Sequence, residues 1–342
     1  MKKIKVGVIG AGSIAQHRHL PEYAANDSVE IVAVCDVVEE RAKEVALKYN
    51  AKAYNDYKEL LADENIDAVS VCTPNYLHAP ISIDALNAGK HVLCEKPMAT
   101  SMEEAKAMIE AADKNGKQLM IGHNQRFVSS HRKAREMIKK GDIGKIYSFR
   151  TAFGHPGPES WSVDGKESWF FIKEKAFIGA MGDLGVHKTD LLRYLLDEEF
   201  SEVAAFVETS SKTNSDVDDN AVCILKTESG IIGTLAASWS YASEDNSTII
   251  YGEKAILRLE DNPNYSLVVQ YKNGDVENHE LGKIQSNEEG GQSNSHVIDE
   301  FVSSLTAEKE VPVPGKEGMK SLNVIISALD AHETKTIVKI QS

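Results

Sequence analysis

The first 122 residues alternate short apolar runs with amphipathic segments, and this alternation constrains the fold more than any other feature of the chain. Apolar runs of strand length lie at residues 4–10, 30–36, 67–72, 90–95 and 117–122. Segments with helical spacing separate several of them, at residues 38–50, 57–63, 80–89 and 101–116. A parallel strand is buried on both faces, so it reads as a nearly continuous apolar run. The pattern therefore predicts an α/β domain, a parallel sheet with helices on both faces, over residues 1–122.

Residues 123–342 have a different pattern, so we expect a domain boundary at residue 122. A predicted helix over 129–141 precedes an aromatic-rich segment at 154–178, which is too long for a simple connection. Runs that indicate strands follow at residues 203–209, 221–227, 231–239, 247–252, 255–260 and 266–272. Two C-terminal helices are expected at residues 295–305 and 316–334. Short turns join the strands, which predicts an α+β domain with a large, mostly antiparallel, open-faced sheet.

The composition argues against several classes of protein. The formal net charge is −14, because 52 acidic residues outnumber 38 basic ones. Nucleic-acid and anionic-membrane surfaces need clustered Lys and Arg, so we expect neither partner. No apolar run approaches the roughly 20 residues of a membrane span, and the N-terminus lacks the apolar stretch of a signal peptide. The sequence has four cysteines, Cys35, Cys72, Cys94 and Cys223, and each lies in an apolar run. Their spacing is not that of metal ligands, so we expect reduced thiols in a cytoplasmic protein and no metal site.

A glycine-rich turn follows the first predicted strand. Gly10, Gly12 and Ala15 form the pattern G-x-G-x-x-A at the start of a predicted helix. This pattern allows a tight turn, a close approach of the backbone to a pyrophosphate, and tight packing of helix on strand. The anion would lie on free N–H groups at the helix N-terminus. We therefore expect Gly10, Gly12, Ser13 and Ile14 to bind a dinucleotide; the alternative is a plain glycine-rich turn.

An acidic residue, Asp36, ends the second predicted strand. Its carboxylate can accept hydrogen bonds from ribose hydroxyls and would repel a 2′-phosphate. Val37 and Val38 follow it directly, and Arg41 lies a full helical turn further on and is expected to face solvent. These features favour NAD over NADP as the cofactor.

Two more strand ends bring candidate residues to the same edge of the sheet, where ligands of such folds bind. The first supplies the expected cofactor contacts Thr73, Pro74 and Asn75. His78, in the same turn, is expected to be a packing or surface histidine. The second strand end reads Glu95, Lys96, Pro97, and the proline restricts the backbone of the lysine. A lysine placed in this way is unusual for a surface loop.

The segment GDLGVHKTD, residues 182–190, places two carboxylates and an imidazole at the start of a predicted helix. At about 100° per residue, Asp183, His187 and Asp190 fall on one edge of that helix, beside an apolar stripe. One interpretation is an N-cap at Asp183 with a surface histidine. The other is a titratable edge that lines a site.

Three motifs in this order resemble the Gfo/Idh/MocA family of oxidoreductases, which includes glucose–fructose oxidoreductase and inositol dehydrogenase. They are G-x-G-x-x-A at 10–15, E-K-P at 95–97 and G-x-x-x-D-x-G-x-H at 179–187, and the resemblance covers essentially the whole chain. It implies a Rossmann fold in the N-terminal domain and NAD as cofactor, with Glu95 and Lys96 among the cofactor contacts. It also implies a catalytic group of Lys96, Asp183 and His187.

The resemblance implies hydride transfer between NAD and a ring hydroxyl or ketone of a sugar or cyclitol. His187 suits the base, because imidazole titrates near neutrality, and Asp183 would orient its ring. Lys96 would hold the substrate hydroxyl and offset the charge of a developing alkoxide. Whether Lys96 or His187 makes the final proton transfer stays open.

Four further residues are candidate substrate contacts. Arg126 either lines the site or forms an ion pair that braces the domain junction. Asp190 either binds a second hydroxyl or lies on the helix surface. His155 and Trp169 belong to the segment 154–178, whose aromatic rings either stack on a sugar or pack down as a lid.

Two other functions stay open at this point. Some members of the family use bound NAD in a redox-neutral cycle that cleaves glycosides, and others resemble sugar-responsive regulators that bind the dinucleotide without catalysis. A regulator has no need of Lys96, Asp183 and His187 together, so the enzyme is favoured. The resemblance further implies a homodimer or homotetramer assembled through the C-terminal sheet.

Overall fold

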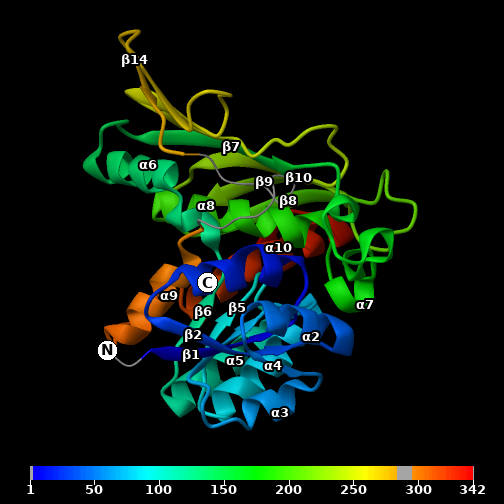
Figure 1. Ribbon diagram of the computed structural model, residues 1–342. Coiled ribbons are helices and arrows are strands. Elements are labelled where there is room, and N and C mark those ends of the chain that lie inside the picture. Colours follow the sequence, from blue (N-terminus) through cyan, green and yellow to red (C-terminus); the bar gives the residue numbers. More distant parts are fainter. Residues whose placement is uncertain (1–2, 283–294, 342) are drawn as a thin grey trace.

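The computed structural model describes residues 3–282 and 295–341, which form two β-sheets, one above the other in Figure 1. The lower sheet has six parallel strands in the order β3-β2-β1-β4-β5-β6, and helices pack on both of its faces. The upper sheet has nine strands in the order β14-β13-β12-β11-β7-β10-β9-β8-β15. We call the two parts the lower and the upper lobe. The predicted fold class is confirmed.

The lower lobe has the parallel strands β1 (Ile4–Ile9), β2 (Val29–Cys35), β3 (Lys52–Tyr54), β4 (Ala68–Val71), β5 (His91–Cys94) and β6 (Leu119–Ile121). Its helices from this part of the chain are η1 (Ala15–His19), α1 (Leu20–Ala25), α2 (Glu39–Lys48), α3 (Tyr57–Leu61), η2 (Asn75–Leu77), α4 (His78–Asn87) and α5 (Met102–Asn115). The five predicted strands are confirmed. The sixth, β3, has only three residues and gives no apolar run in the sequence.

The upper sheet consists of β7 (Ile146–Gly154), β8 (Phe200–Glu208), β9 (Asn220–Thr227), β10 (Ile232–Ser238), β11 (Thr248–Gly252), β12 (Ala255–Leu259), β13 (Leu267–Tyr271), β14 (Val276–His279) and β15 (Val338–Lys339). The helical segments before and beside it are η3 (Asn124–Phe127), α6 (Ser129–Lys140), η4 (Pro158–Ser160), η5 (Gly165–Glu167), η6 (Trp169–Phe171), α7 (Lys173–Ala176), η7 (Met181–Gly185) and α8 (Val186–Leu196). Only β7 and β10 pair in parallel, and the other described neighbours are antiparallel.

Strand β7 lies at the centre of the upper sheet, and the sequence analysis does not predict it. Its buried residues Phe149 and Thr151 flank the exposed Arg150, so inward and outward side chains alternate. The outward-facing Arg150 is charged, and the inward-facing Thr151 is polar. The segment therefore has no continuous apolar run in the sequence. The edge strands β14 and β15 are missed because they have four and two residues.

The last two helices, α9 (Val297–Thr306) and α10 (Gly315–Thr334), return to the lower lobe. Phe301 of α9 is fully buried in the core of the lower sheet. In α10, Leu322 packs in that same core, whereas Ile325 packs in the core of the upper sheet. A boundary at residue 122 therefore does not separate the two cores, because the predicted 123–342 domain supplies part of the first one.

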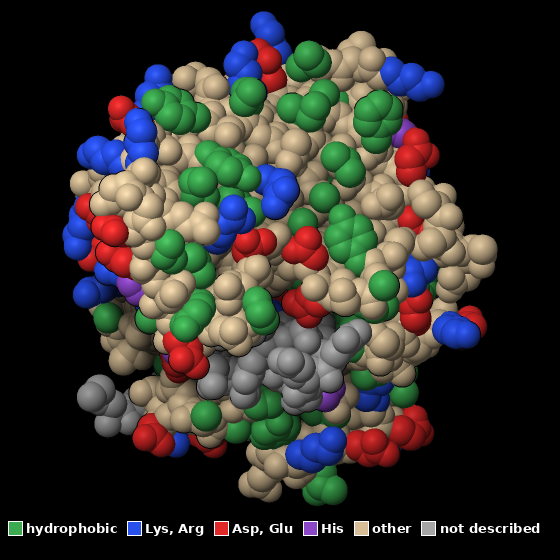
Figure 2. Space-filling model, turned by 90° about the horizontal axis from the view of Figure 1, so that it is seen from above, with side chains coloured by type: hydrophobic (Ala, Val, Ile, Leu, Met, Phe, Trp, Pro, Cys, Tyr) green, Lys and Arg blue, Asp and Glu red, His purple; other side chains and the backbone are tan. Residues whose placement is uncertain are grey.

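One face of the upper sheet is covered by α6, α8 and α10, and the other face is open (Figure 1). Apolar side chains gather on this outer face, as Figure 2 shows. They include Phe206 of β8, Val222 and Ile224 of β9, and Ile232 of β10, which are between 47% and 75% exposed. We call these four residues the outer apolar patch.

No helix among residues 3–282 and 295–341 is both long enough and apolar enough to cross a membrane. In the same residues, no group of His, Cys, Asp and Glu side chains is arranged to hold a metal ion. All four cysteines are buried and free, as expected for reduced thiols.

Candidate active site

A pocket of about 760 Å³ lies where the carboxyl ends of the lower strands face the upper lobe. Both lobes line it. All ten predicted cofactor-binding residues are on its wall: Gly10, Gly12, Ser13, Ile14, Asp36, Thr73, Pro74, Asn75, Glu95 and Lys96. Of the predicted catalytic and substrate residues, Asp183, His187, His155 and Trp169 also line it, whereas Arg126 and Asp190 do not.

The glycine-rich turn has the form that a pyrophosphate site needs. Gly10 has φ +91°, and a Cβ there would lie 2.6 Å from the carbonyl oxygen of Cys72. A Cβ on Gly12 would meet nothing within 4 Å, so the backbone is open to the pocket at that point. The residues present therefore fit a dinucleotide, which would approach the turn at Gly12.

Asp36 braces this turn from the second strand. Its Oδ2 accepts the N–H of Ala11 at 2.9 Å and its Oδ1 accepts the N–H of Val38 at 2.9 Å. Each oxygen keeps a further lone pair with which it could accept a ribose hydroxyl. Arg41 does not face solvent as predicted, because its guanidinium lies 3.6 Å from Asp36 and donates to Asp164 of the upper lobe at 3.1 Å. The prediction failed because α2 turns Arg41 toward the pocket, where two carboxylates hold it.

A segment of the upper lobe, residues 161–164, crosses onto the glycine-rich turn, and we call it the strap. The Ser13 hydroxyl donates to the carbonyl oxygen of Trp161 at 2.9 Å and accepts the N–H of Val163 at 3.1 Å. Together with the pair between Arg41 and Asp164, these bonds tie the strap to the lower lobe. The sequence assigns Ser13 to the cofactor and gives no sign of this second contact.

His78 is fully buried, so the packing interpretation of this residue holds. Its Nδ1 lies 2.7 Å from the carbonyl oxygen of Pro97, and its Nε2 lies 2.8 Å from that of Thr73. Burial lowers the pKa of the imidazole, against the effect of these two carbonyls. His78 thus links the loop that carries Lys96 to the neighbouring strand end.

Glu95 belongs to a buried polar chain under the pocket. Its Oε1 lies 2.8 Å from Nε2 of His19 and 3.3 Å from Nη1 of Arg18. Burial alone would raise the pKa of Glu95, but the hydrogen bond of His19 and the charge of Arg18 hold it well below its ordinary value. His19 in turn reaches the Ser70 hydroxyl. The sequence analysis missed Arg18 and His19, because they lie just beyond the glycine motif on the same helix.

Lys96 and Asp183 meet across the pocket. The ammonium group of Lys96 donates to Oδ1 of Asp183 at 2.7 Å and to its backbone oxygen at 3.0 Å. The second oxygen, Oδ2, accepts the indole N–H of Trp239 at 3.1 Å. Asp183 therefore orients Lys96 and not the ring of His187, which corrects the role predicted for it. Trp239, fully buried in the upper lobe, was not anticipated because its ring is remote in sequence.

His187 lies beside this pair on the same pocket wall and is 7% exposed. Its Nδ1 has no hydrogen-bond partner within the described part of the chain. Burial, followed by the positive charge of Lys96, holds the pKa of His187 well below its ordinary value. The imidazole is therefore neutral at physiological pH and has a ring nitrogen able to accept a proton.

The segment that carries Asp183 begins with a π-helical turn, η7, and continues into α8. Asp183 lies inside this turn and is not an N-cap. A π-helical turn contains more residues than an α-helical one, so spacing at 100° per residue does not hold across it. Asp183 and His187 face the pocket, whereas Asp190, one turn further on, faces the junction between the lobes.

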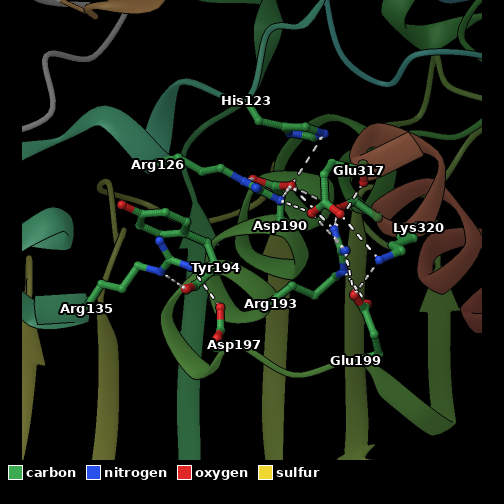
Figure 3. Close-up of polar contacts among 11 residues, drawn as sticks. His123, Arg126, Arg135, Asp190, Arg193, Tyr194, Asp197, Glu199, Glu317 and Lys320 are labelled. Carbon is green, nitrogen blue, oxygen red and sulfur yellow. Dashed lines mark hydrogen bonds and ion pairs between the residues drawn. The ribbon is translucent and has the colours of Figure 1, made fainter. Parts of the chain in front are cut away.

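At this junction Asp190 pairs with Arg126 through two hydrogen bonds of 2.6 and 2.7 Å (Figure 3). Ser321 of α10 donates to Oδ1 of Asp190 at 3.0 Å, and Glu317 of α10 accepts a hydrogen bond from Arg126 at 3.1 Å. Burial would raise the pKa of Asp190, but the charges of Arg126 and His123 lower it to about 2. The geometry fits an ion pair that braces three segments, the second of the two interpretations open for Arg126.

The aromatic segment of the upper lobe both packs on itself and lines the pocket. Trp169 stacks on Phe170 with ring centroids 3.9 Å apart, and Phe170 meets Trp161 edge to face at 5.1 Å. His155 uses its Nδ1 to accept the N–H of Gly157 at 3.0 Å. All four aromatic side chains border the pocket, so ring surface faces a bound ligand there.

Comparisons with known proteins agree with this fold. Residues 4–123 match the oxidoreductase family with an NAD-binding Rossmann fold, and residues 131–258 match the GFO/IDH/MocA C-terminal domain. The chain belongs to the Gfo/Idh/MocA family of NAD-binding oxidoreductases.

Individual relatives cover most of the chain. A levoglucosan dehydrogenase of Pseudarthrobacter phenanthrenivorans is 31% identical over 72% of this chain and 70% of its own. A myo-inositol 2-dehydrogenase of Thermotoga maritima is 28% identical over 99% of both chains. A structure titled levoglucosan dehydrogenase, complex with NADH and levoglucosan, superposes with a TM-score of 0.89 at 25% identity and covers 100% of each chain.

Proposed function

We propose that this protein is an NAD-dependent dehydrogenase that oxidises a ring hydroxyl of a sugar or cyclitol, or reduces the corresponding ketone. One observation carries the proposal: the Lys96 ammonium, fixed by Asp183, and the neutral His187 share a pocket with a dinucleotide turn. Relatives named levoglucosan dehydrogenase and myo-inositol 2-dehydrogenase support the substrate class.

Lys96 is the group that we assign to the substrate hydroxyl. An ammonium has three N–H donors, and Asp183 takes two of them. The third is left to donate to the reacting oxygen and to stabilise the negative charge that grows on it. NAD, when bound, supplies the acceptor for the hydride.

His187 is the group that we assign to the hydroxyl proton. Its imidazole is neutral, and the positive charge of Lys96 nearby disfavours its protonated form. A proton that arrives on His187 is therefore readily passed on to solvent or back to the substrate. In this proposal Lys96 binds the oxygen of the substrate hydroxyl, and His187 accepts the proton of the same hydroxyl.

The test uses purified protein with NAD or NADP and a panel of inositols, glucose, glucosides and anhydrosugars. We expect NADH to accumulate with at least one compound and NADP to be the poorer cofactor. Sugar release from a glycoside without net NADH would instead identify redox-neutral cleavage. Tight NADH binding with no turnover of any compound, tested in both directions, would identify a binding protein.

We also propose that the outer apolar patch joins two copies of the chain, as a dimer or as part of a tetramer. Four large apolar side chains lie on three neighbouring strands of one open sheet face and form a surface that water would otherwise cover. Light scattering on the intact protein and on Ile224→Lys tests this. The wild type should be an oligomer, and a charge in the patch should shift it toward monomer.

We propose a cytoplasmic location, with a small molecule and other copies of the chain as the binding partners. The four free cysteines are typical of a reducing compartment, and the net charge of −14 opposes binding to nucleic acid. Fractionation of cells that express the protein tests the location.

A further inference from the structure

A carboxylate outside the pocket holds the start of the helix that carries Asp183 and His187. Asp218 lies in the turn before β9 and is 7% exposed. Its Oδ1 accepts the N–H of Gly179 at 2.7 Å, and its Oδ2 accepts the N–H of Met181 at 2.7 Å. Its backbone oxygen accepts the N–H of Ala180 at 2.9 Å. One residue thus binds three successive N–H groups that have no partner inside the helix.

These three N–H groups lie two to four residues before Asp183. The N–H of Asp183 donates to the carbonyl oxygen of Gly179 at 2.9 Å, so the first turn is built on the residues that Asp218 holds. The next residue, Asp219, accepts the backbone N–H of Trp239 at 2.8 Å through its carbonyl oxygen. Trp239 is the second partner of the Asp183 carboxylate. The turn at residues 218–219 therefore holds both the helix start that precedes Asp183 and the tryptophan that binds its carboxylate.

The contact between the two segments is close. A Cβ on Gly179 would lie 1.8 Å from the backbone oxygen of Asp218, so a larger residue there would push the helix start away. This explains the first glycine of the 179–187 motif, for which the sequence analysis found no structural reason. Gly179 permits the approach, and Asp218 makes the hydrogen bonds.

Asp218 has no ion pair with any described residue. The hydrogen bonds that it accepts from the helix N–H groups offset part of the cost of burying its carboxylate. Burial raises its pKa to about 6, although its backbone hydrogen bonds act in the opposite direction. A buried carboxylate without a cation is unfavourable by itself. It remains here because an ionised acceptor binds backbone N–H groups more strongly than a neutral one.

We infer that Asp218 is a positioning residue: by fixing Gly179–Met181 it sets Asp183, and through Asp183 the ammonium of Lys96. The inference rests on the proposed function for its link to catalysis. Asp218 does not line the pocket, so we expect its effect to be on the rate of the chemical step and not on cofactor binding.

The test compares Asp218→Asn with the wild type. The amide keeps one acceptor oxygen and turns its NH₂ toward the other backbone N–H, so one of the two bonds is lost. We expect kcat to fall about tenfold or more, since small misplacements of catalytic groups are costly, while the Kd for NADH stays within about twofold. Glu22→Gln is the matched control: Glu22 is a buried carboxylate that binds Ser295 away from the pocket, and this variant should keep its kcat.

Amide hydrogen exchange over residues 179–183 gives a readout that needs no substrate. The wild type should protect these amides, and Asp218→Asn should weaken that protection while the rest of the chain keeps it. An unchanged kcat in folded Asp218→Asn, or wild-type amides at 179–181 that exchange as freely as exposed ones, would overturn the inference. If the wild type turns over no compound of the panel in either direction, the proposed function fails, and exchange alone still decides whether Asp218 holds the helix.

Discussion

The Nζ atom of Lys96 lies 2.7 Å from Oδ1 of Asp183, and the two residues come from different lobes. Their side chains are 13% and 8% exposed, so the pair is shielded from solvent, and Trp239 holds the far side of the carboxylate. The proposed site exists only while the two lobes keep this contact.

Lys96→Met, Asp183→Asn and His187→Ala should each lower kcat by about 100-fold or more, the lower range for acid–base groups. Stopped-flow and steady-state assays with a sugar found active would measure this, with NADH binding as a check that the pocket is intact. Lys90→Met is the control, because Lys90 is another buried lysine that binds two backbone carbonyls outside the pocket. It should lower stability and leave kcat unchanged.

Arg126→Met should destabilise the protein by about 3–5 kcal/mol, because Asp190 would remain as a buried carboxylate without its main partner. Urea unfolding measures the loss. Adding Asp190→Asn to this variant should restore part of the stability, since the unpaired charge is gone. A rise in the KM for sugar with little change in stability would instead place Arg126 in the substrate site.

Ser13→Ala should speed NADH dissociation by up to roughly 30-fold, because the strap loses two hydrogen bonds of about 1 kcal/mol each. Asp164→Ala removes the exposed partner of Arg41 in the same strap and should act in the same direction, by less than about fivefold. Stopped-flow NADH fluorescence measures both rates. An effect of Ser13→Ala alone would mean that Ser13 acts by touching the cofactor.

Stability should fall as the pH drops below about 6.5, the ordinary pKa of histidine. Burial lowers the pKa of His123 to about 4 and that of His131 to about 3, and it holds that of His187 well below its ordinary value. The unfolded chain therefore binds protons between pH 6.5 and 4 that the folded chain does not, and each such histidine costs about 1.4 kcal/mol between pH 7.5 and 5.5.

Asp218 acts the other way, because its raised pKa of about 6 lets the folded chain bind a proton first. The three histidines together change the free energy of unfolding more than the one carboxyl does, so the protein should be more stable at neutral pH than at acidic pH. Urea midpoints at several pH values measure it. His131→Asn, which removes a buried imidazole outside the pocket, should flatten the curve, and an equal slope in that variant would contradict the assignment.

Much of this arrangement could be predicted from local pattern, and the remainder depends on contacts between distant segments. Continuous apolar runs mark the parallel strands, and the glycine turn, Asp36 and Lys96 all lie at strand ends, where the fold brings them together. Strand β7 has polar residues on its open face and so lacks an apolar run. Periodicity cannot anticipate the π-helical turn at Asp183, which separates Asp190 from the pocket.

Partners from elsewhere in the chain decide the other differences. Arg41 turns inward because Asp164, in the upper lobe, meets it. Asp183 turns to Lys96 and Trp239, although His187 is nearer in sequence. A helical spacing gives the direction of a side chain relative to its own helix, but the group that it meets is supplied by another part of the fold.

Because α10 contributes Leu322 to one core and Ile325 to the other, a ribosome makes the residues that complete both cores only after strands β1 to β14. Until then the nascent chain carries two unfinished sheets, each with apolar surface that α9 and α10 will later cover. Final packing of both lobes therefore waits until α10 has been made, and a chain that stops after residue 282 would leave part of each core uncovered and prone to aggregation.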